Sequence, residues 1–287
     1  MSHATFNGAK LWYEESGQGP QTVVLAHGLA FSGAMFDAQV AALSEHYRCI
    51  TFDLRGHGKS ELSTTGYDMD TLAGDAAALI EKIAGVPVHF VGWSIGGFTG
   101  LRIALWRPEL LRSLTLIGSS AMGGTESARS FKLVPLLARA FGMRALAGSL
   151  MKTMFSDRFR SDPSHATLVE KWRQHFLSDE KLGVSRAARG VIARRSVESE
   201  LPALRLPVLM IRGEVDAVLP ATAAARTIEK IPDGKFVTIA GAGHACNIEE
   251  PSAVNAALAG FFAEARLQSA NGPSRPQLAS RMHESVV

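Results

Sequence analysis

Cysteine is scarce in this sequence. Two of the 287 residues are cysteines, Cys49 and Cys246. Two cysteines in a chain of this length do not make the disulfide framework that stabilises small secreted domains. The N-terminal residues also lack a basic stretch followed by an apolar core, so no secretory signal is visible. We therefore expect two free thiols and a location in the reducing environment of the cytoplasm.

Long hydrophobic runs and a strong excess of one charge are also missing. No apolar run reaches the roughly 18 residues needed to span a bilayer, so we expect no stable membrane anchoring. The 30 Lys and Arg nearly balance the 27 Asp and Glu, and a net charge of +3 is weak evidence for a nucleic-acid partner. Apolar residues make up 46% of the chain, which excludes a disordered chain. We expect a globular monomer or homodimer that binds no nucleic acid.

Short apolar segments alternate with helical patterns in the N-terminal part of the chain and again near its end. Residues 22–28 and 86–93 are apolar runs typical of strands buried on both faces. Residues 69–85 and 250–265 place apolar side chains at helical spacing. This alternation predicts an α/β fold with a mostly parallel sheet of about eight strands and helices on both faces. The other predicted elements are strands at 10–16, 47–53, 111–118, 206–213 and 235–241, and helices at 36–47, 95–108 and 221–232.

The alternation breaks after the sixth expected strand. Residues of about 120–205 show helical periodicity only, over a length too great for a loop. We expect a helical cap inserted into one catalytic core formed by residues 1–119 and 206–265. From Arg266 the chain is rich in Ser, Pro, Gln and Arg without periodicity, so residues 266–287 are predicted to be a flexible tail.

The predicted cap and core carry opposite net charges. Residues 125–206 hold 15 Lys and Arg against 8 Asp and Glu, and the tail from Arg266 holds 3 against 1. The remainder holds 12 against 18, so an acidic core lies under a basic cap. The simplest interpretation is a solvated cationic surface. The alternative is steering of anionic substrates or docking to an anionic surface.

A strand-to-helix turn contains the strongest catalytic motif. Gly92-Trp93-Ser94-Ile95-Gly96 has the pattern G-x-S-x-G between a predicted strand and a predicted helix. Glycines two residues before and after the serine permit a sharp, strained turn that lifts the hydroxyl clear of the sheet. The start of the next helix offers free N–H groups to a developing oxyanion. The motif predicts that Ser94 is a nucleophile.

A nucleophilic serine needs a neighbouring base and an orienting acid. His244 lies on a glycine-rich loop after a predicted strand, at the same edge of the sheet as Ser94. Asp216 also follows a strand and is the preferred acid, with Glu214 as the fallback. We expect a Ser94, Asp216, His244 triad in that chain order.

Five motifs in this order carry a family resemblance over residues of about 5 to 265. The sequence resembles the α/β-hydrolase fold family, in the branch of small cofactor-free esterases, 3-oxoadipate enol-lactonases and haloperoxidase-like perhydrolases. The resemblance implies that Ser94, Asp216 and His244 form the triad. It also implies an oxyanion hole made by the backbone N–H groups of Leu29 and Ile95. The motifs are His27-Gly28 after a strand, Asp53-Leu54-Arg55-Gly56-His57-Gly58-Lys59-Ser60, GWSIGG, GEVDAVLP and GAGHACNIEEP.

The expected activity is that of a serine hydrolase. It would cleave a carboxylic ester or lactone of a largely apolar small molecule through an acyl-enzyme, with no cofactor and no metal. A carbon–carbon bond hydrolase or a perhydrolase would use the same triad and stays open as an alternative. A ligand receptor or binding protein on a hydrolase scaffold is the alternative from another class.

The residues of the substrate pocket are harder to predict. Phe31, Trp93 and Leu219 are neighbours of catalytic positions in the sequence and are expected to line it. Three further aromatic or sulfur-containing residues of the insertion are also candidates. No motif ties an arginine to the pocket, so a carboxylate-bearing substrate is neither supported nor excluded. The three candidates from the insertion are Phe131, Met154 and Trp172.

Overall fold

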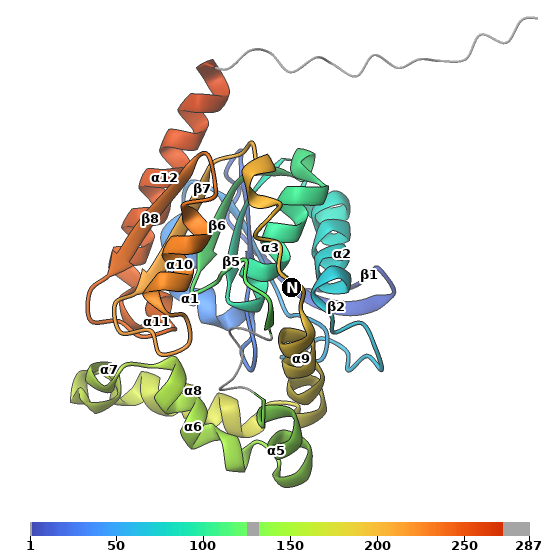
Figure 1. The fold of residues 1–287 in the computed structure, drawn as a ribbon, viewed down its shortest axis with the longest axis vertical. Coiled ribbons are helices and arrows are strands. Elements are labelled where there is room, and N and C mark those ends of the chain that lie inside the picture. The colour runs from blue at the N-terminus through green and yellow to red at the C-terminus, as the bar shows by residue number, and fades with distance from the viewer. Residues whose placement is uncertain (1, 86, 125–131, 272–287) are drawn as a thin grey trace, which may run out of the picture.

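The computed structural model describes residues 2–85, 87–124 and 132–271 (Figure 1). Its strands are β1 (Ser2–Phe6), β2 (Ala9–Ser16), β3 (Thr22–Ala26), β4 (Arg48–Phe52), β5 (Val88–Trp93), β6 (Leu111–Ile117), β7 (Val208–Gly213) and β8 (Gly234–Ile239). They form an eight-stranded sheet in the order β1-β2-β4-β3-β5-β6-β7-β8. The pairs β1–β2 and β2–β4 are antiparallel, and all the others are parallel. The predicted, mostly parallel sheet of about eight strands is confirmed.

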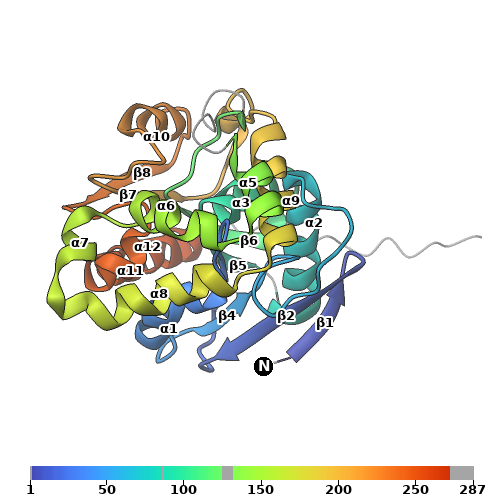
Figure 2. The ribbon, with the colours of Figure 1, turned by 90° about the horizontal axis from the view of Figure 1, so that it is seen from below.

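Helices cover both faces of this sheet (Figures 1 and 2). The core helices are α1 (Asp37–Leu43), α2 (Met69–Leu79), α3 (Ile95–Trp106), α10 (Ala221–Ile228), α11 (Cys246–Glu249) and α12 (Pro251–Asn271). Helices α2 and α3 pack together on one face, and α1 and α12 pack together on the other. Because both faces are covered, strands β5 and β7 are buried at every position, as their continuous apolar sequences predict. The short 3-10 helices are η1 (Gly33–Phe36), η3 (Pro108–Leu110), η5 (Pro163–His165) and η6 (Leu201–Ala203), and η2 (Ile80–Ala84) is a π-helical segment that follows α2.

The parallel register brings several strand ends to one edge of the sheet. Trp93 of β5 pairs with Ile117 of β6, and Gly213 of β7 pairs with Ile239 of β8. The carboxyl ends of these strands therefore lie side by side. In an open α/β sheet this edge is where ligands bind.

A helical insertion separates β6 from β7 in the chain. We use this name for residues 134–193, which gather beyond one end of the sheet (Figure 1). The N–H of Ala245, in the loop after β8, donates to the carbonyl of Met154 at 2.8 Å, so the insertion contacts the carboxyl edge. No helix in the described part of the chain is long and apolar enough to cross a membrane. The helices of the insertion are α5 (Val134–Phe141), α6 (Arg144–Met154), α7 (Asp157–Ser161), α8 (Ala166–Ser178) and α9 (Lys181–Ala193).

Two terminal features differ from the sequence prediction. The sequence does not predict strand β1, because residues 2–6 show no alternation of apolar and polar side chains. In the structure only Phe6 of this strand is buried. The strand forms by antiparallel pairing with β2.

Helix α12 continues to Asn271, so the predicted tail from Arg266 begins at least six residues too early. Arg, Leu, Gln and Ala are good helix formers and extend the helix there. Residues 272–287 lie outside the described part.

Candidate active site

Ser94 occupies the sharp turn between β5 and α3. Its backbone has φ 50° and ψ −108°, a conformation that costs free energy for a residue with a side chain. A Cβ at Gly92 would lie 2.3 Å from the backbone of Gly96, and one at Gly96 would lie 2.0 Å from the carbonyl oxygen of Ala26. Only glycine fits at these two positions. The packing therefore supports the strained turn that the G-x-S-x-G pattern predicts.

His244 and Asp216 form a buried pair at the same edge. Nδ1 of His244 lies 2.9 Å from Oδ2 of Asp216. The other carboxylate oxygen, Oδ1, accepts hydrogen bonds from the N–H groups of Val218 and Leu219 at 2.8 and 2.9 Å. Burial raises the pKa of Asp216, but the His244 ring and these N–H donors outweigh it and lower the pKa below its usual value. Asp216 is therefore ionised at neutral pH and can orient the imidazole.

The His244 ring is held next to the serine turn. Trp93, the residue before Ser94, donates from Nε1 to the His244 carbonyl at 2.9 Å, and the two rings lie 4.7 Å apart. A Cβ at Gly118 would come within 2.9 Å of the ring, so the end of β6 closes it from another side. With Nδ1 donating to the carboxylate, Nε2 is left as the acceptor. Nε2 is buried and has no hydrogen-bond partner among the described residues. It can serve as a general base.

Glu214 and Cys246 also lie near this site, in different surroundings. Glu214, the fallback acid, is exposed and accepts from the N–H of Gly241 at 2.8 Å. The carboxylate bonded to the His244 ring is that of Asp216. Burial raises the pKa of the Cys246 thiol well above its usual range, so this thiol stays neutral and is a poor nucleophile.

The loop after β3 packs directly against the serine turn. A Cβ at Gly28 would lie 2.9 Å from Cβ of Ser94, so the backbone that leads to Leu29 passes close to Ser94. His27 holds this loop, since its Nε2 accepts from the N–H of Leu54 at 2.9 Å and its Nδ1 bonds the Gly28 carbonyl at 2.8 Å. Burial lowers the pKa of His27 to about 3, so the ring is neutral and can make both bonds.

Ile95 is the first residue of α3. Its N–H has no partner one turn earlier in the helix and lies at the positive end of the helix dipole. Together with the N–H of Leu29 it is the candidate oxyanion hole that the resemblance implies. Ile95 comes directly after Ser94 at the start of the helix, and Leu29 comes directly after Gly28 in the loop.

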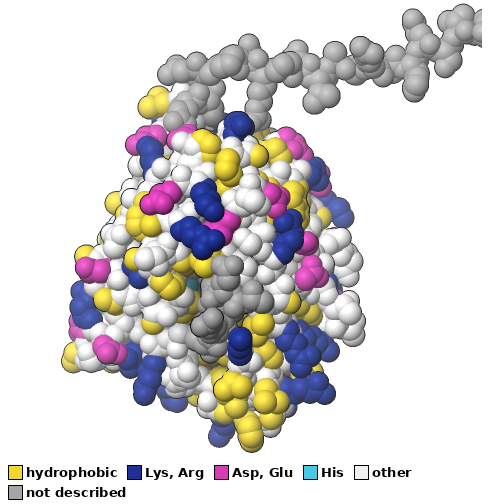
Figure 3. Space-filling view, viewed as in Figure 1, with side chains coloured by type: hydrophobic (Ala, Val, Ile, Leu, Met, Phe, Trp, Pro, Cys, Tyr) yellow, Lys and Arg dark blue, Asp and Glu magenta, His cyan; other side chains and the backbone are white. Residues whose placement is uncertain are grey.

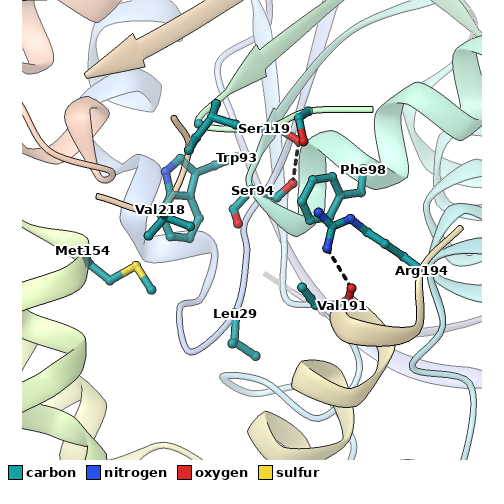
Figure 4. A pocket seen from close by; sticks show the side chains of 12 residues that line it. Leu29, Trp93, Ser94, Phe98, Ser119, Met154, Val191, Arg194 and Val218 are labelled. Atoms are coloured by element: carbon teal, nitrogen blue, oxygen red, sulfur yellow. Dashed lines mark hydrogen bonds between the residues drawn. The ribbon is translucent and has the colours of Figure 1, made fainter. Parts of the chain in front are cut away.

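A pocket opens in front of Ser94 (Figure 4). Three of the predicted wall residues, Trp93, Met154 and Leu219, line it. Phe31 and Trp172 are not in its wall. They are buried and pack on each other with ring centroids 4.9 Å apart. Adjacency to a catalytic motif does not determine where the Phe31 side chain points, and helical spacing in the insertion does not determine that Trp172 reaches the pocket. The prediction for Phe131 lies outside the described residues. The described lining consists of Leu29, Trp93, Ser94, Phe98, Gly118, Ser119, Ser120, Met154, Val191, Arg194, Val218 and Leu219.

Comparison with known proteins shows the family of this chain. A family model described as the alpha/beta hydrolase fold matches residues 21–251. The chain belongs to the α/β-hydrolase fold family. The resemblance seen in the sequence is thereby confirmed, and the chain is an α/β-hydrolase enzyme.

Individual relatives of this α/β-hydrolase are named as ester- and lactone-cleaving enzymes. The 3-oxoadipate enol-lactonase 1 of Acinetobacter baylyi is 30% identical over 241 residues, covering 83% of this chain and 87% of that protein. The pimeloyl-[acyl-carrier protein] methyl ester esterase of Aeromonas hydrophila is 31% identical over 248 residues, covering 83% and 93%. The crystal structure of the enol-lactonase from Burkholderia xenovorans LB400 superposes with a TM-score of 0.86 at 27% identity, covering 91% of this chain and 100% of that one.

The sequence did not predict several pocket residues of this α/β-hydrolase. Phe98 lies one turn into α3, and its position after Ser94 could have indicated it. Val191 and Arg194 come from the end of α9, about a hundred residues from Ser94, and no local motif marks them. Among the described residues no group of three or more His, Cys, Asp and Glu side chains is placed to hold a metal ion.

Proposed function

We propose that this α/β-hydrolase is a serine hydrolase that cleaves a carboxylic ester or lactone of a small molecule. The observation that carries the proposal is the buried pair of His244 and Asp216, whose Nε2 is available beside the strained turn of Ser94. Relatives named as an enol-lactonase and a methyl ester esterase support the bond type. The mainly apolar walls support a largely apolar substrate.

In the first half of the proposed reaction Oγ of Ser94 attacks the carbonyl carbon. Nε2 of His244 takes the hydroxyl proton, and Asp216 stabilises the imidazolium that forms. The N–H groups of Leu29 and Ile95 bind the negative oxygen of the tetrahedral intermediate, each contributing about 3 kcal/mol. When the carbonyl re-forms, the bond to the alcohol oxygen breaks and the His244 imidazolium protonates that oxygen. The acyl group stays on Ser94.

In the second half a water molecule removes the acyl group. His244 takes a proton from the water, whose oxygen attacks the acyl carbon, and the same N–H groups hold the second oxyanion. The intermediate collapses, Oγ of Ser94 regains its proton from His244, and the carboxylic acid leaves. The insertion would act as a cap that limits water around these steps, because Met154 and Val191 bring its helices into the pocket wall.

A panel of short and long acyl esters, lactones and enol-lactones tests this function. We expect hydrolysis of at least one ester or lactone class, and Ser94→Ala should lower kcat by roughly five to six orders of magnitude. Ser120→Ala is the matched control, because Ser120 lines the same pocket without lying on the nucleophile turn. Hydrolysis that persists in Ser94→Ala would overturn the proposal.

A further inference from the structure

Helix α5 of the insertion exposes large apolar side chains to solvent. Leu133, just before the helix, is 63% exposed, Leu136 is 62% exposed and Phe141, its last residue, is 69% exposed. The buried side of this helix carries the smaller residues Pro135 and Ala138. Figure 3 shows hydrophobic side chains gathered at the lower end of the molecule, where Figure 1 places α5. A gathering of this kind on a surface marks an interaction site.

The helices that surround this apolar surface contain cations without carboxylates. Helix α5 packs on α6 and α9, and none of these three helices contains Asp or Glu. Arg139, Arg144 and Arg189 are exposed, and no carboxylate in the described part of the chain forms an ion pair with them. Figure 3 shows Lys and Arg side chains on both sides of the hydrophobic ones. The surface therefore combines apolar side chains with positive charge that the described chain does not neutralise.

A groove next to α5 has the same combination of properties. It lies between α6 and α8 and has a volume of about 340 Å³. Met151, Val169 and Leu177 give it apolar walls, Arg144 and Arg173 give it cations, and no described Asp or Glu lines it. Figure 2 looks onto this end of the molecule and shows α5, α6 and α8 on the same side. The cationic and apolar surface thus extends beyond α5.

We propose that this surface docks reversibly on a lipid bilayer that contains anionic phospholipids. We call it the insertion face and define it by Leu133, Leu136, Arg139, Phe141 and Arg144. In the docked state the three apolar side chains enter the boundary between headgroups and acyl chains, and the arginines contact the phosphate groups. Docking of this kind needs no spanning helix, and it goes beyond the proposed hydrolase function.

The shape and charge of the insertion face favour a bilayer over other partners. The positive charge complements anionic headgroups, whereas a second copy of this chain would bring two sets of cations together. Helix α5 forms a convex end of the molecule (Figure 1). A protein partner would need a groove of matching shape, because protein interfaces are closely packed. A fluid bilayer accepts a convex end without one, so it accommodates both the apolar side chains and the cations.

Sedimentation with lipid vesicles measures the docking of the full-length protein. The probes are vesicles of phosphatidylcholine alone and vesicles in which about one third of the lipid is phosphatidylglycerol. We expect a partition coefficient at least about tenfold higher on the anionic vesicles. It should fall as salt is added, because screening weakens the attraction between arginines and headgroups. Absence of binding to the anionic vesicles at low salt would overturn the proposal.

Leu136→Ser tests the apolar part of the insertion face. The partition coefficient on anionic vesicles should fall about tenfold, because a leucine side chain no longer enters the bilayer. The melting temperature should not change, since this side chain is mostly exposed. Leu267→Ser is the matched control, because Leu267 is 60% exposed near the end of α12, at the opposite end of the molecule (Figure 1). Equal effects of the two substitutions would contradict docking through α5.

Arg144→Gln tests the cationic part. We expect the partition coefficient on anionic vesicles to fall about three- to fivefold, as one contact with a headgroup is lost. Arg205→Gln makes the same change in net charge and should have little effect. Arg205 is exposed, comes shortly before β7 at the opposite edge of the sheet, and donates to the carbonyls of Pro202 and Leu204. If both variants bound equally, net charge rather than the insertion face would control binding, and the proposal would be wrong.

Two further outcomes would assign the insertion face to another partner and overturn the proposal. Binding that responds to Arg144→Gln but not to Leu136→Ser would indicate an acidic macromolecule bound by charge alone. An oligomer that Leu136→Ser dissociates, together with no vesicle binding, would indicate an interface between copies of this chain. Hydrolysis of a water-soluble ester should be the same in Leu136→Ser and wild type. Failure of docking therefore leaves the proposed serine hydrolase function intact.

Discussion

At the scale of single residues, the two oxygens of the Asp216 carboxylate have different partners. Oδ1 accepts from the N–H groups of Val218 and Leu219, while Oδ2 faces Nδ1 of His244. The N–H groups of Val218 and Leu219 require an acceptor at the position of Oδ1. The group at the position of Oδ2 is therefore the one that faces Nδ1 of His244. This arrangement decides which nitrogen of His244 carries the proton.

Asp216→Asn tests this arrangement directly. The amide oxygen of Asn would take the place of Oδ1 beside the N–H donors, so the NH₂ group would face His244 Nδ1. Nδ1 would then have to accept, Nε2 would carry the proton, and the base would be blocked. We expect kcat to fall about 10⁴-fold with little loss of folding, measured on whichever ester is cleaved fastest.

Glu214→Gln is the control for this prediction. Glu214 is exposed and bonds the N–H of Gly241, a bond that glutamine can keep. Its kcat should stay within about threefold of wild type. If Glu214→Gln were the inactive variant and Asp216→Asn the active one, the acid would be misassigned.

At the scale of elements, a buried carboxylate joins the helical insertion to the loop that carries His244. Glu249 of α11 accepts from the N–H of Gly243, the residue before His244, at 3.0 Å. It also accepts from the N–H and the hydroxyl of Ser156, at 3.1 and 2.5 Å. Ser156 precedes α7 and caps it by accepting from the N–H of Phe159. One cluster therefore fixes both the insertion and the loop that carries His244.

Ser156→Ala should weaken this connection. The substitution removes a hydrogen bond to a buried carboxylate and a helix cap, which together stabilise the fold by about 2 kcal/mol. Urea denaturation followed by circular dichroism measures the change. Ser161→Ala, at the exposed end of the same helix, should change the unfolding free energy by less than about 0.5 kcal/mol. Equal effects of the two substitutions would contradict the structural role of the cluster.

A buried carboxyl group at the junction between α8 and α9 makes the free energy of unfolding depend on pH. Asp179 lies there, and its Oδ2 is buried without a hydrogen-bond partner among the described residues. Burial, with smaller contributions from the negative charges of Asp53 and Glu180, raises the pKa of Asp179 to about 7. The folded protein therefore keeps this proton between about pH 4 and 7, whereas the unfolded chain loses it. Stability contributed by Asp179 consequently falls as pH rises through this window.

Asp179→Asn removes this titration. Relative to wild type, the variant should gain about 1 to 3 kcal/mol of unfolding free energy above pH 7, and the difference should vanish near pH 4. Denaturation curves at several pH values measure it. A difference that is the same at every pH would show that Asp179 does not titrate in this way.

At the scale of the whole molecule, the sequence predicts what depends on local signals. The nucleophile turn, the strand ends and the alternation of strands and helices are marked by glycines and apolar runs, so the sheet and the positions of Ser94, Asp216 and His244 could be predicted. The pocket wall could not, because it is assembled from segments far apart in the chain. Phe31 is buried in the core, although it lies only two residues after Leu29, which lines the pocket. Arg194 reaches the site only because α9 ends there.

The central claim is that Ser94 is a nucleophile activated by His244 and Asp216. The most direct measurement is the mass of the intact full-length protein after incubation with a fluorophosphonate, followed by peptide mapping. We predict one covalent adduct per chain, located on Ser94, absent in Ser94→Ala and formed far more slowly in Asp216→Asn. No adduct on the wild-type protein, or an adduct that persists in Ser94→Ala, would contradict the account.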